Sequence, residues 1–178
     1  MLQIRHGVFE TNSSSSHSIS VRKINEITTP EEIAEEFKWR LGKDGVLILW
    51  GHYLEFDRSP FMPLTSFFDK IRFAIASYNT HPDAIDDIKN IMFKHIPGLK
   101  SIEFDTKWGY EDEKVPDYGY IDHQSIGVLQ GFLATHNVPL EEFLLNKKYV
   151  VFVDGDEYHI KEQLFESGLL HKEDFEEV

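Results

Sequence analysis

The stretch LTSFFDKIRFAIASY, residues 64–78, decides most about the fold. Its large apolar side chains recur at steps of three and four residues, which is the spacing of one face of an α-helix. The members of this stripe are Leu64, Phe67, Phe68, Ile71, Ile75 and Tyr78. The helical period runs from Ser59 to Pro97 and is broken at residues 80–82, which predicts a long helix followed by a second one. So aromatic a stripe is typical of a core face, and we expect the helix to be buried.

Shorter apolar runs on both sides of this region predict strands. Residues 46–50 are expected to form a buried strand that makes a hairpin with 53–56, and residues 100–104 are a further candidate strand. A run at 148–153 ends at Asp154-Gly155, the signal of a two-residue hairpin that returns through 157–160. An early strand is expected around Ile19 and Val21. The strands therefore favour a mainly antiparallel sheet.

The remaining periodic segments predict helices. Pro30 with two following glutamates is typical of a helix start, and Leu140 to Leu145 and Lys161 to Ser167 are shorter candidates. Asp122 is placed as the N-cap of a helix with the stripe Ile126, Leu129, Phe132 and Leu133. The prediction for residues 1–178 is a single α+β domain with a mainly antiparallel sheet and about five helices.

Composition and charge exclude several classes of protein. The chain has no cysteine, so disulfides and thiol chemistry are excluded. Its formal net charge is −13 and no lysine or arginine cluster is present, so direct binding to nucleic acid is not expected. The apolar runs are too short to span a membrane and the N-terminus lacks a signal pattern, which predicts a cytoplasmic protein with no membrane contact.

The segment FETNSSSSHS, residues 9–18, concentrates the polar chemistry of the chain. It lies between two expected strands, where functional loops are commonly found. A second polar segment, DHQS at residues 122–125, follows at an expected helix start. The candidate site that these segments define consists of Glu10, Asn12, Ser13, His17, Asp122 and His123.

Four interpretations of this site remain open. A serine with His17 as base would make a nucleophilic site, although no Gly-x-Ser-x-Gly elbow is present. Glu10, His17 and His123 with Asp154 or Asp156 would make a metal site of imidazole and carboxylate ligands. The serines with Arg5 would make an anion pocket, without a Walker pattern to support it. In the structural alternative, the hydroxyl and amide groups bond to their own backbone and hold a tight turn.

The two polar segments also carry a family resemblance. The pattern R-x-G-x-F-E-T-N-S-S-S-x-H-S at residues 5–18, together with DHQS at 122–125, resembles the signature of a family of small proteins encoded by phages and other mobile elements of bacteria. The resemblance covers about the first 20 residues and the later short element. It implies a phage origin and a shared feature made of Glu10, Asn12, Ser13, His17 and His123, and it implies no particular activity.

Two functions follow from these observations. The first is a phage-encoded acidic protein that binds a basic surface on a host protein, such as a defence or nucleic-acid-processing component. The second is a small metal-assisted or phosphate-handling hydrolase centred on the serine-rich turn, His17 and His123. The acidic composition favours the first function, and the density of polar side chains at one place favours the second.

Overall fold

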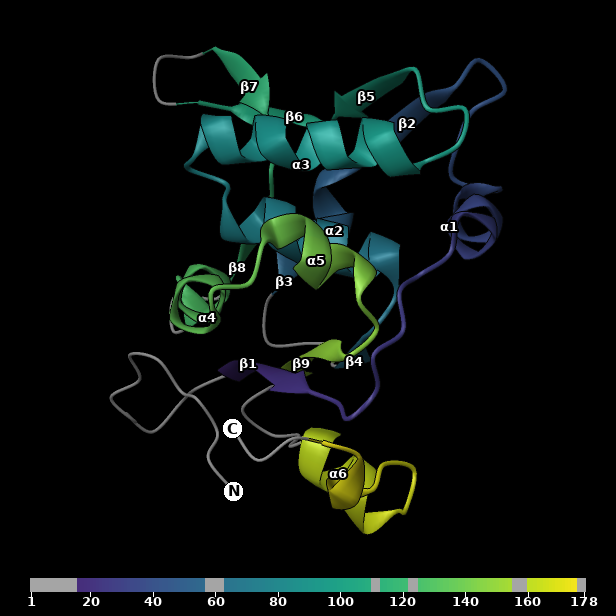
Figure 1. The fold of residues 1–178 in the computed structure, drawn as a ribbon. Coiled ribbons are helices and arrows are strands. Elements are labelled where there is room, and N and C mark those ends of the chain that lie inside the picture. Colours follow the sequence, from purple (N-terminus) through teal and green to yellow (C-terminus); the bar gives the residue numbers. More distant parts are fainter. Residues whose placement is uncertain (1–15, 57–62, 110–112, 122–124, 155–159, 176–178) are drawn as a thin grey trace.

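Helix α2 (Phe67–Ser77) lies at the centre of the fold, with the other elements packed around it (Figure 1). The computed structural model describes residues 16–56, 63–109, 113–121, 125–154 and 160–175. The helix begins after Ser66, whose hydroxyl accepts a hydrogen bond from the Asp69 N–H at 3.1 Å. Eight of its 11 residues are buried, so the helix is covered on nearly all sides, as its apolar sequence predicts.

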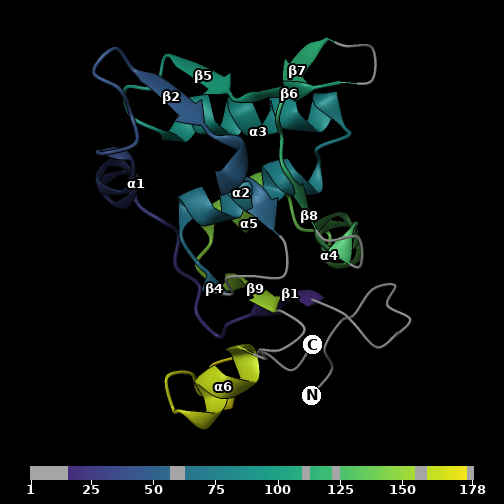
Figure 2. The ribbon, with the colours of Figure 1, turned by 180° about the vertical axis from the view of Figure 1, so that it is seen from behind.

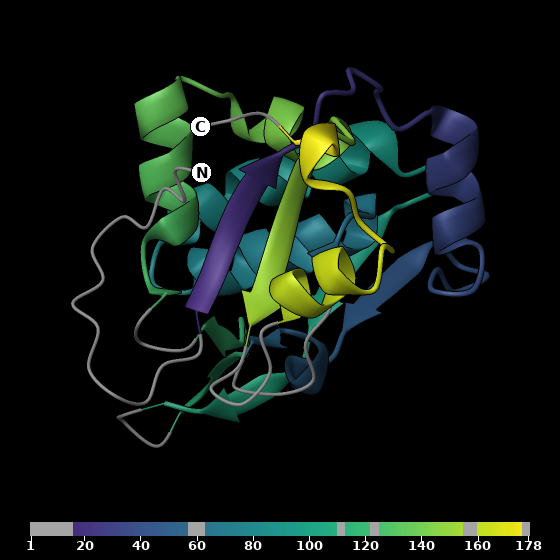
Figure 3. The ribbon, with the colours of Figure 1, turned by 90° about the horizontal axis from the view of Figure 1, so that it is seen from below.

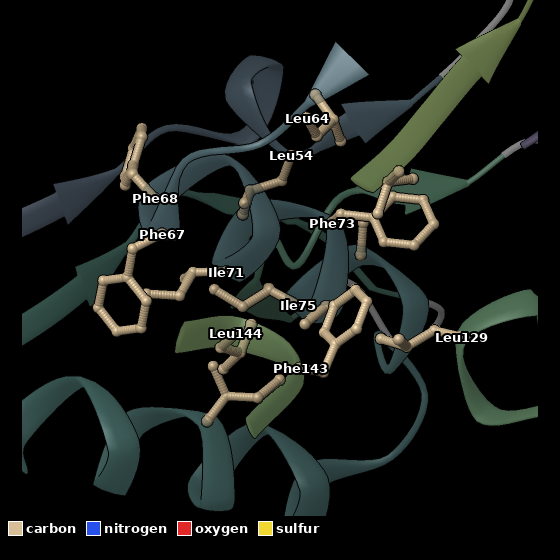
Figure 4. Packing of buried hydrophobic residues seen from close by; sticks show 14 of the residues in the cluster. Leu54, Leu64, Phe67, Phe68, Ile71, Phe73, Ile75, Leu129, Phe143 and Leu144 are labelled. Atoms are coloured by element: carbon tan, nitrogen blue, oxygen red, sulfur yellow. The ribbon is translucent and has the colours of Figure 1, made fainter. Parts of the chain in front are cut away.

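Four helices surround α2. Helix α1 (Pro30–Phe37) contacts its first turns, α3 (Pro82–His95) runs along one side, and α4 (Val128–His136) and α5 (Leu140–Leu145) cover the other side. Figure 2 shows the same arrangement from behind. In the core, side chains of α2 meet apolar side chains from other elements, including Leu54, Leu64, Leu129, Phe143 and Leu144 (Figure 4).

A three-stranded antiparallel sheet closes the core opposite α3. Its order is β1 (Ser16–Val21), β9 (Tyr149–Asp154) and β4 (Pro63–Leu64), with Ile19 opposite Val151. Successive side chains of β9 point to opposite faces, so Val151 joins the main core while Phe152 packs on the outer face with Phe175. Helix α6 (Ile160–Glu166) covers that outer face (Figure 3). The strand β9 is therefore buried on both sides.

The other strands form two-stranded pairs. Strand β2 (Val46–Leu49) pairs in parallel with β5 (Ser101–Phe104), and β3 (Glu55–Phe56) pairs in parallel with β8 (Tyr120–Ile121). Strands β6 (Thr106–Trp108) and β7 (Lys114–Pro116) form an antiparallel pair. Three of these five strand pairings are antiparallel and six α-helices are described, which confirms the expected α+β class.

The expected hairpin between residues 46–50 and 53–56 is wrong. A short 3₁₀ helix, η1 (Gly51–Tyr53), separates β2 from β3, and each strand pairs with a strand more than 50 residues later. The helical connection through α2 and α3 allows the parallel partner β5 to lie beside β2. Leu64 was also expected in the helix, but it belongs to β4 because the Ser66 cap begins α2 after it.

The prediction of a hairpin after Asp154 is wrong at the end of its return strand. Residues 155–159, which contain its turn and most of the return strand, lie outside the described residues. Ile160, the last residue of the expected strand, begins α6, and the two neighbours of β9 are β1 and β4. The helices expected at 140–145 and 161–167 are present, the second as Ile160–Glu166.

Candidate functional site

The structure describes one of the six candidate site residues, His17. Glu10, Asn12, Ser13, Asp122 and His123 lie outside the described residues, as do Arg5 of the expected anion pocket and Asp156 of the expected metal site. Asp154 ends β9, where its backbone lies opposite that of Ser16. Within the described residues, no group of three or more His, Asp and Glu side chains is placed to hold a metal ion.

His17 lies in the interior of the fold. It is the second residue of β1, it faces Val153 across the strand pair, and its side chain is 5% exposed. Its ring lies 6.0 Å from the ring of Phe73 on α2. The first polar segment therefore ends inside the core, where this imidazole contributes to packing.

His17 also connects the two polar segments. Its backbone N–H donates a hydrogen bond of 2.9 Å to the hydroxyl oxygen of Ser125, the last residue of DHQS. Ser125 is 2% exposed, and α4, which follows it, contacts β1. The C-terminal ends of the segments 9–18 and 122–125 therefore meet, although they are more than 100 residues apart in the chain.

The start of α4 differs from the sequence expectation. The helix begins at Val128, and its N-cap position is Gly127 with a φ of 84°, so Asp122 is not the N-cap. A residue with positive φ cannot continue a right-handed helix, so the helix starts after it. Glycine tolerates that conformation best. Ile126, expected in the buried stripe of this helix, is 71% exposed because it precedes the glycine.

The most perturbed charge in the described residues is one that the sequence analysis missed. Lys70 lies within the apolar stripe of α2 and is fully buried. Its ammonium donates hydrogen bonds to the carbonyl oxygens of Phe143, at 3.0 Å, and Asn146, at 2.9 Å, at the C-terminal end of α5. These carbonyls are ones that the helix itself leaves without a donor. The sequence feature that could have identified this buried charge is a single lysine among the apolar positions of the helix.

Burial changes the titration of this group. Loss of hydration lowers the pKa of Lys70 to about 7, and the nearby Glu36 carboxylate opposes this by favouring the charged form. A lysine of this pKa can act as a base or nucleophile where substrate reaches it. Here the nitrogen is enclosed and bonded to main-chain carbonyls, so its role is to join α2 to α5.

Comparisons with known proteins leave the site without a described counterpart. No protein-family model, no curated protein and no solved structure matches this chain. Among the described residues, no helix is long and apolar enough to cross a membrane.

The pKa of Lys70 predicts a pH dependence of stability. Between pH 7 and the ordinary lysine pKa of about 10.5, the unfolded chain keeps a proton that the folded chain has released, so stability rises with pH. The free energy of unfolding rises by about 1 kcal/mol per pH unit, and by at most ~1.4 kcal/mol per pH unit. Urea denaturation from about pH 7 to about pH 9 measures it, and Lys70→Met should lose this contribution to the slope. Equal slopes in both proteins would contradict the assignment.

The hydrogen bond at Ser125 predicts a loss of stability on removal. Ser125→Ala leaves the buried His17 N–H without its acceptor, so the free energy of unfolding should fall by about 1–3 kcal/mol. Ser167→Ala is the matched control, since the Ser167 hydroxyl is exposed and, among the described residues, bonds only the Leu164 carbonyl. That control should change stability by less than about 0.5 kcal/mol. An equally small effect of Ser125→Ala in urea denaturation would show that the segment contact is weak.

Proposed function

We propose that the protein is a phage-encoded interaction protein that binds a basic surface on a host protein in the bacterial cytoplasm. The phage origin is what the resemblance of residues 5–18 implies. The choice of a basic protein partner is supported by the way charge is distributed over the described residues.

About half of the lysines in the described residues are already neutralised within the fold. Six of them form ion pairs with carboxylates, and Lys70 is buried. The paired lysines are Lys38, Lys89, Lys94, Lys107, Lys147 and Lys148. With a net charge of −13, the excess that remains is carboxylate and lies at the surface. Such a surface attracts basic partners and repels phosphate chains.

One group of carboxylates is best placed for a partner, and we name it the C-terminal acidic patch. Among the described residues its members have no ion-pair partner, and all are exposed on α6 and on the 3₁₀ helix η3 (Lys172–Asp174). They are Glu162, Glu166, Glu173 and Asp174. This observation carries the proposal, because four unpaired carboxylates on two elements that pack together can pair with one partner without breaking existing ion pairs.

The patch is held in place by aromatic packing. Phe175, which follows η3, packs against Phe152 of β9 in a tilted contact and against Phe165 of α6 in an edge contact, with ring centroids 6.1 and 5.8 Å apart. Beside the patch, Leu169 is 73% exposed and adds an apolar contact point. Lys172 is exposed between the acidic residues and lies 5.8 Å from the Phe165 ring. Acidic side chains beside an exposed leucine fit an interface with a polar rim.

The proposal predicts that host binding depends on where the charges are. Replacing the four patch residues by Gln or Asn should abolish capture of a host protein that the wild-type chain retains at about 0.05 M salt and releases at about 0.5 M. The matched control removes the same number of charges elsewhere, at Glu31, Asp83, Asp87 and Glu113, which are exposed and unpaired in the described structure. The control should retain the partner. Equal loss in both variants, or capture insensitive to salt, would contradict the proposal.

The contact between His17 and Ser125 favours a second candidate, the hydrolase. A site built from residues 9–18 and 122–125 requires those segments to meet, and their ends do. The burial of His17 weighs against the hydrolase, because substrate does not reach a buried imidazole. The chemistry would then depend on the remaining members of the candidate site. We therefore rank the hydrolase second.

The hydrolase predicts that His123→Ala abolishes hydrolysis of chromogenic phosphate or acyl esters while the melting temperature stays unchanged. His123 would then act on the reacting atoms as base or metal ligand. His171→Ala is the control, because His171 is exposed near the C-terminus. The wild-type chain would be assayed with Mg²⁺, Mn²⁺ and Zn²⁺ in turn. Absence of hydrolysis with every metal, or a large fall in melting temperature of His123→Ala, would contradict this function.

A further inference from the structure

A cavity of about 630 Å³ opens between the C-terminal end of α1, the outward face of β2, η1 and α2. Its volume lies within the range of small-molecule sites, about 300–1,000 Å³. The lining that matters consists of four aromatic rings and two arginines, which we name the aromatic–arginine cavity. These residues are Trp39, Arg40, Trp50, Tyr53, Phe68 and Arg72.

Three of the rings that line the cavity are also exposed. Trp39 is 85% exposed, Trp50 46% and Tyr53 45%. Trp50 follows β2 and continues its outward face, since Ile48 is 42% exposed while Leu49 is buried. Exposed rings that line one cavity are typical of a surface that stacks a planar ligand.

The two arginines converge on one ring from different elements. The guanidinium carbon of Arg40 lies 4.4 Å from the centroid of Phe68, and that of Arg72 lies 5.8 Å from the same centroid. Arg72 is partly fixed, because it donates to the Tyr53 carbonyl oxygen and to Asp69 at 3.2 Å. Arg40 donates to the Glu36 carbonyl oxygen. Each guanidinium keeps further N–H groups beyond these bonds among the described residues.

Their proximity has an electrostatic cost. Burial lowers the pKa of Arg72, Asp69 opposes that change, and the charge of Arg40 lowers the pKa further. The Asp69 carboxylate pairs with Arg72, whereas Arg40 has no ion pair among the described residues. An anion at the mouth of the cavity could accept hydrogen bonds from both guanidiniums.

We propose that the aromatic–arginine cavity binds a nucleoside phosphate, whose base stacks on the exposed rings and whose phosphate pairs with Arg40 and Arg72. A planar base and an anionic group joined by a short sugar match rings and guanidiniums that line the same cavity. Asp44 and Glu103 also line it and can accept hydrogen bonds from base N–H groups or ribose hydroxyls. The site lies on elements other than α6 and η3, so it goes beyond the host-binding proposal.

The carboxylates also separate a free nucleotide from a nucleic-acid strand. Asp44 and Glu103 would repel further phosphates placed beyond the two arginines, and the chain as a whole carries a charge of −13. The occupant is therefore a single nucleotide and not a strand.

Isothermal titration calorimetry of the full chain tests this site. The probes are AMP, GMP, CMP and UMP, then the di- and triphosphates of the best binder, with its nucleoside, inorganic phosphate and a short single-stranded oligonucleotide as comparisons. At least one nucleotide should bind with one-to-one stoichiometry and more tightly than its nucleoside or phosphate alone.

Matched variants assign the binding to the cavity. Arg40→Gln and Trp39→Ala should each weaken the nucleotide by about tenfold or more, since a charged hydrogen bond or a stacked base contributes at least that much. Lys114→Gln and Trp108→Ala are the controls. Trp108 is also exposed, at 70%, and Lys114 lies 5.8 Å from its ring, in the hairpin of β6 and β7. The controls should bind like the wild-type chain, and Trp39→Tyr should restore most of the affinity.

Four results would overturn the proposal. They are no binding of any nucleotide at millimolar concentration, equal weakening by Lys114→Gln, tighter binding of the oligonucleotide than of any nucleotide, and loss in Trp39→Ala that Trp39→Tyr does not restore. Circular dichroism melting of each variant checks that it is folded. We expect wild-type melting, since both Trp39 and Arg40 are exposed.

Discussion

The constraint on which this fold depends is the buried ammonium of Lys70. An amine at the centre of α2 must find acceptors inside an apolar core, because an unpaired charge there would cost several kcal/mol. The carbonyls of Phe143 and Asn146 meet that need and fix the end of α5 against α2. Asn146 then donates through its side chain to Asn25, at 3.1 Å, and so connects this point to the segment between β1 and α1. One lysine thus sets the relative positions of elements from both halves of the chain.

Much of the fold could be predicted because it is encoded locally. The apolar period and the Ser66 cap define α2, and the short helix α5 has the bounds that its sequence predicts. Strand pairing is not local, and the two parallel pairs could not be inferred from residues next to each other in the chain. The run 46–50 looked like a buried hairpin strand, yet Ile48 and Trp50 face outward. Which face of a two-stranded pair is covered depends on distant elements such as α2.

Less of the candidate site could be predicted than of the fold. The composition of residues 9–18 and 122–125 singled out two segments whose ends meet through His17 and Ser125. Composition could not show that the His17 ring points into the core against Phe73. The aromatic–arginine cavity was missed because its residues lie on several elements and form no motif. Only the packing of α1 against α2 places Arg40 over Phe68.

The two proposed surfaces are compatible because an exposed charge acts only over a short distance in salt, whatever the net charge of the chain. At physiological ionic strength, exposed charges are screened over about 8 Å, so the C-terminal acidic patch scarcely affects an anion at a separate cavity. Within the cavity, an anion in contact with the two guanidiniums near Phe68 lies well inside this screening length, so their attraction is retained. A chain of phosphates would extend beyond that local field into the acidic surroundings, whereas one nucleotide remains inside it. An acidic protein can therefore bind a small anion while it repels a nucleic acid.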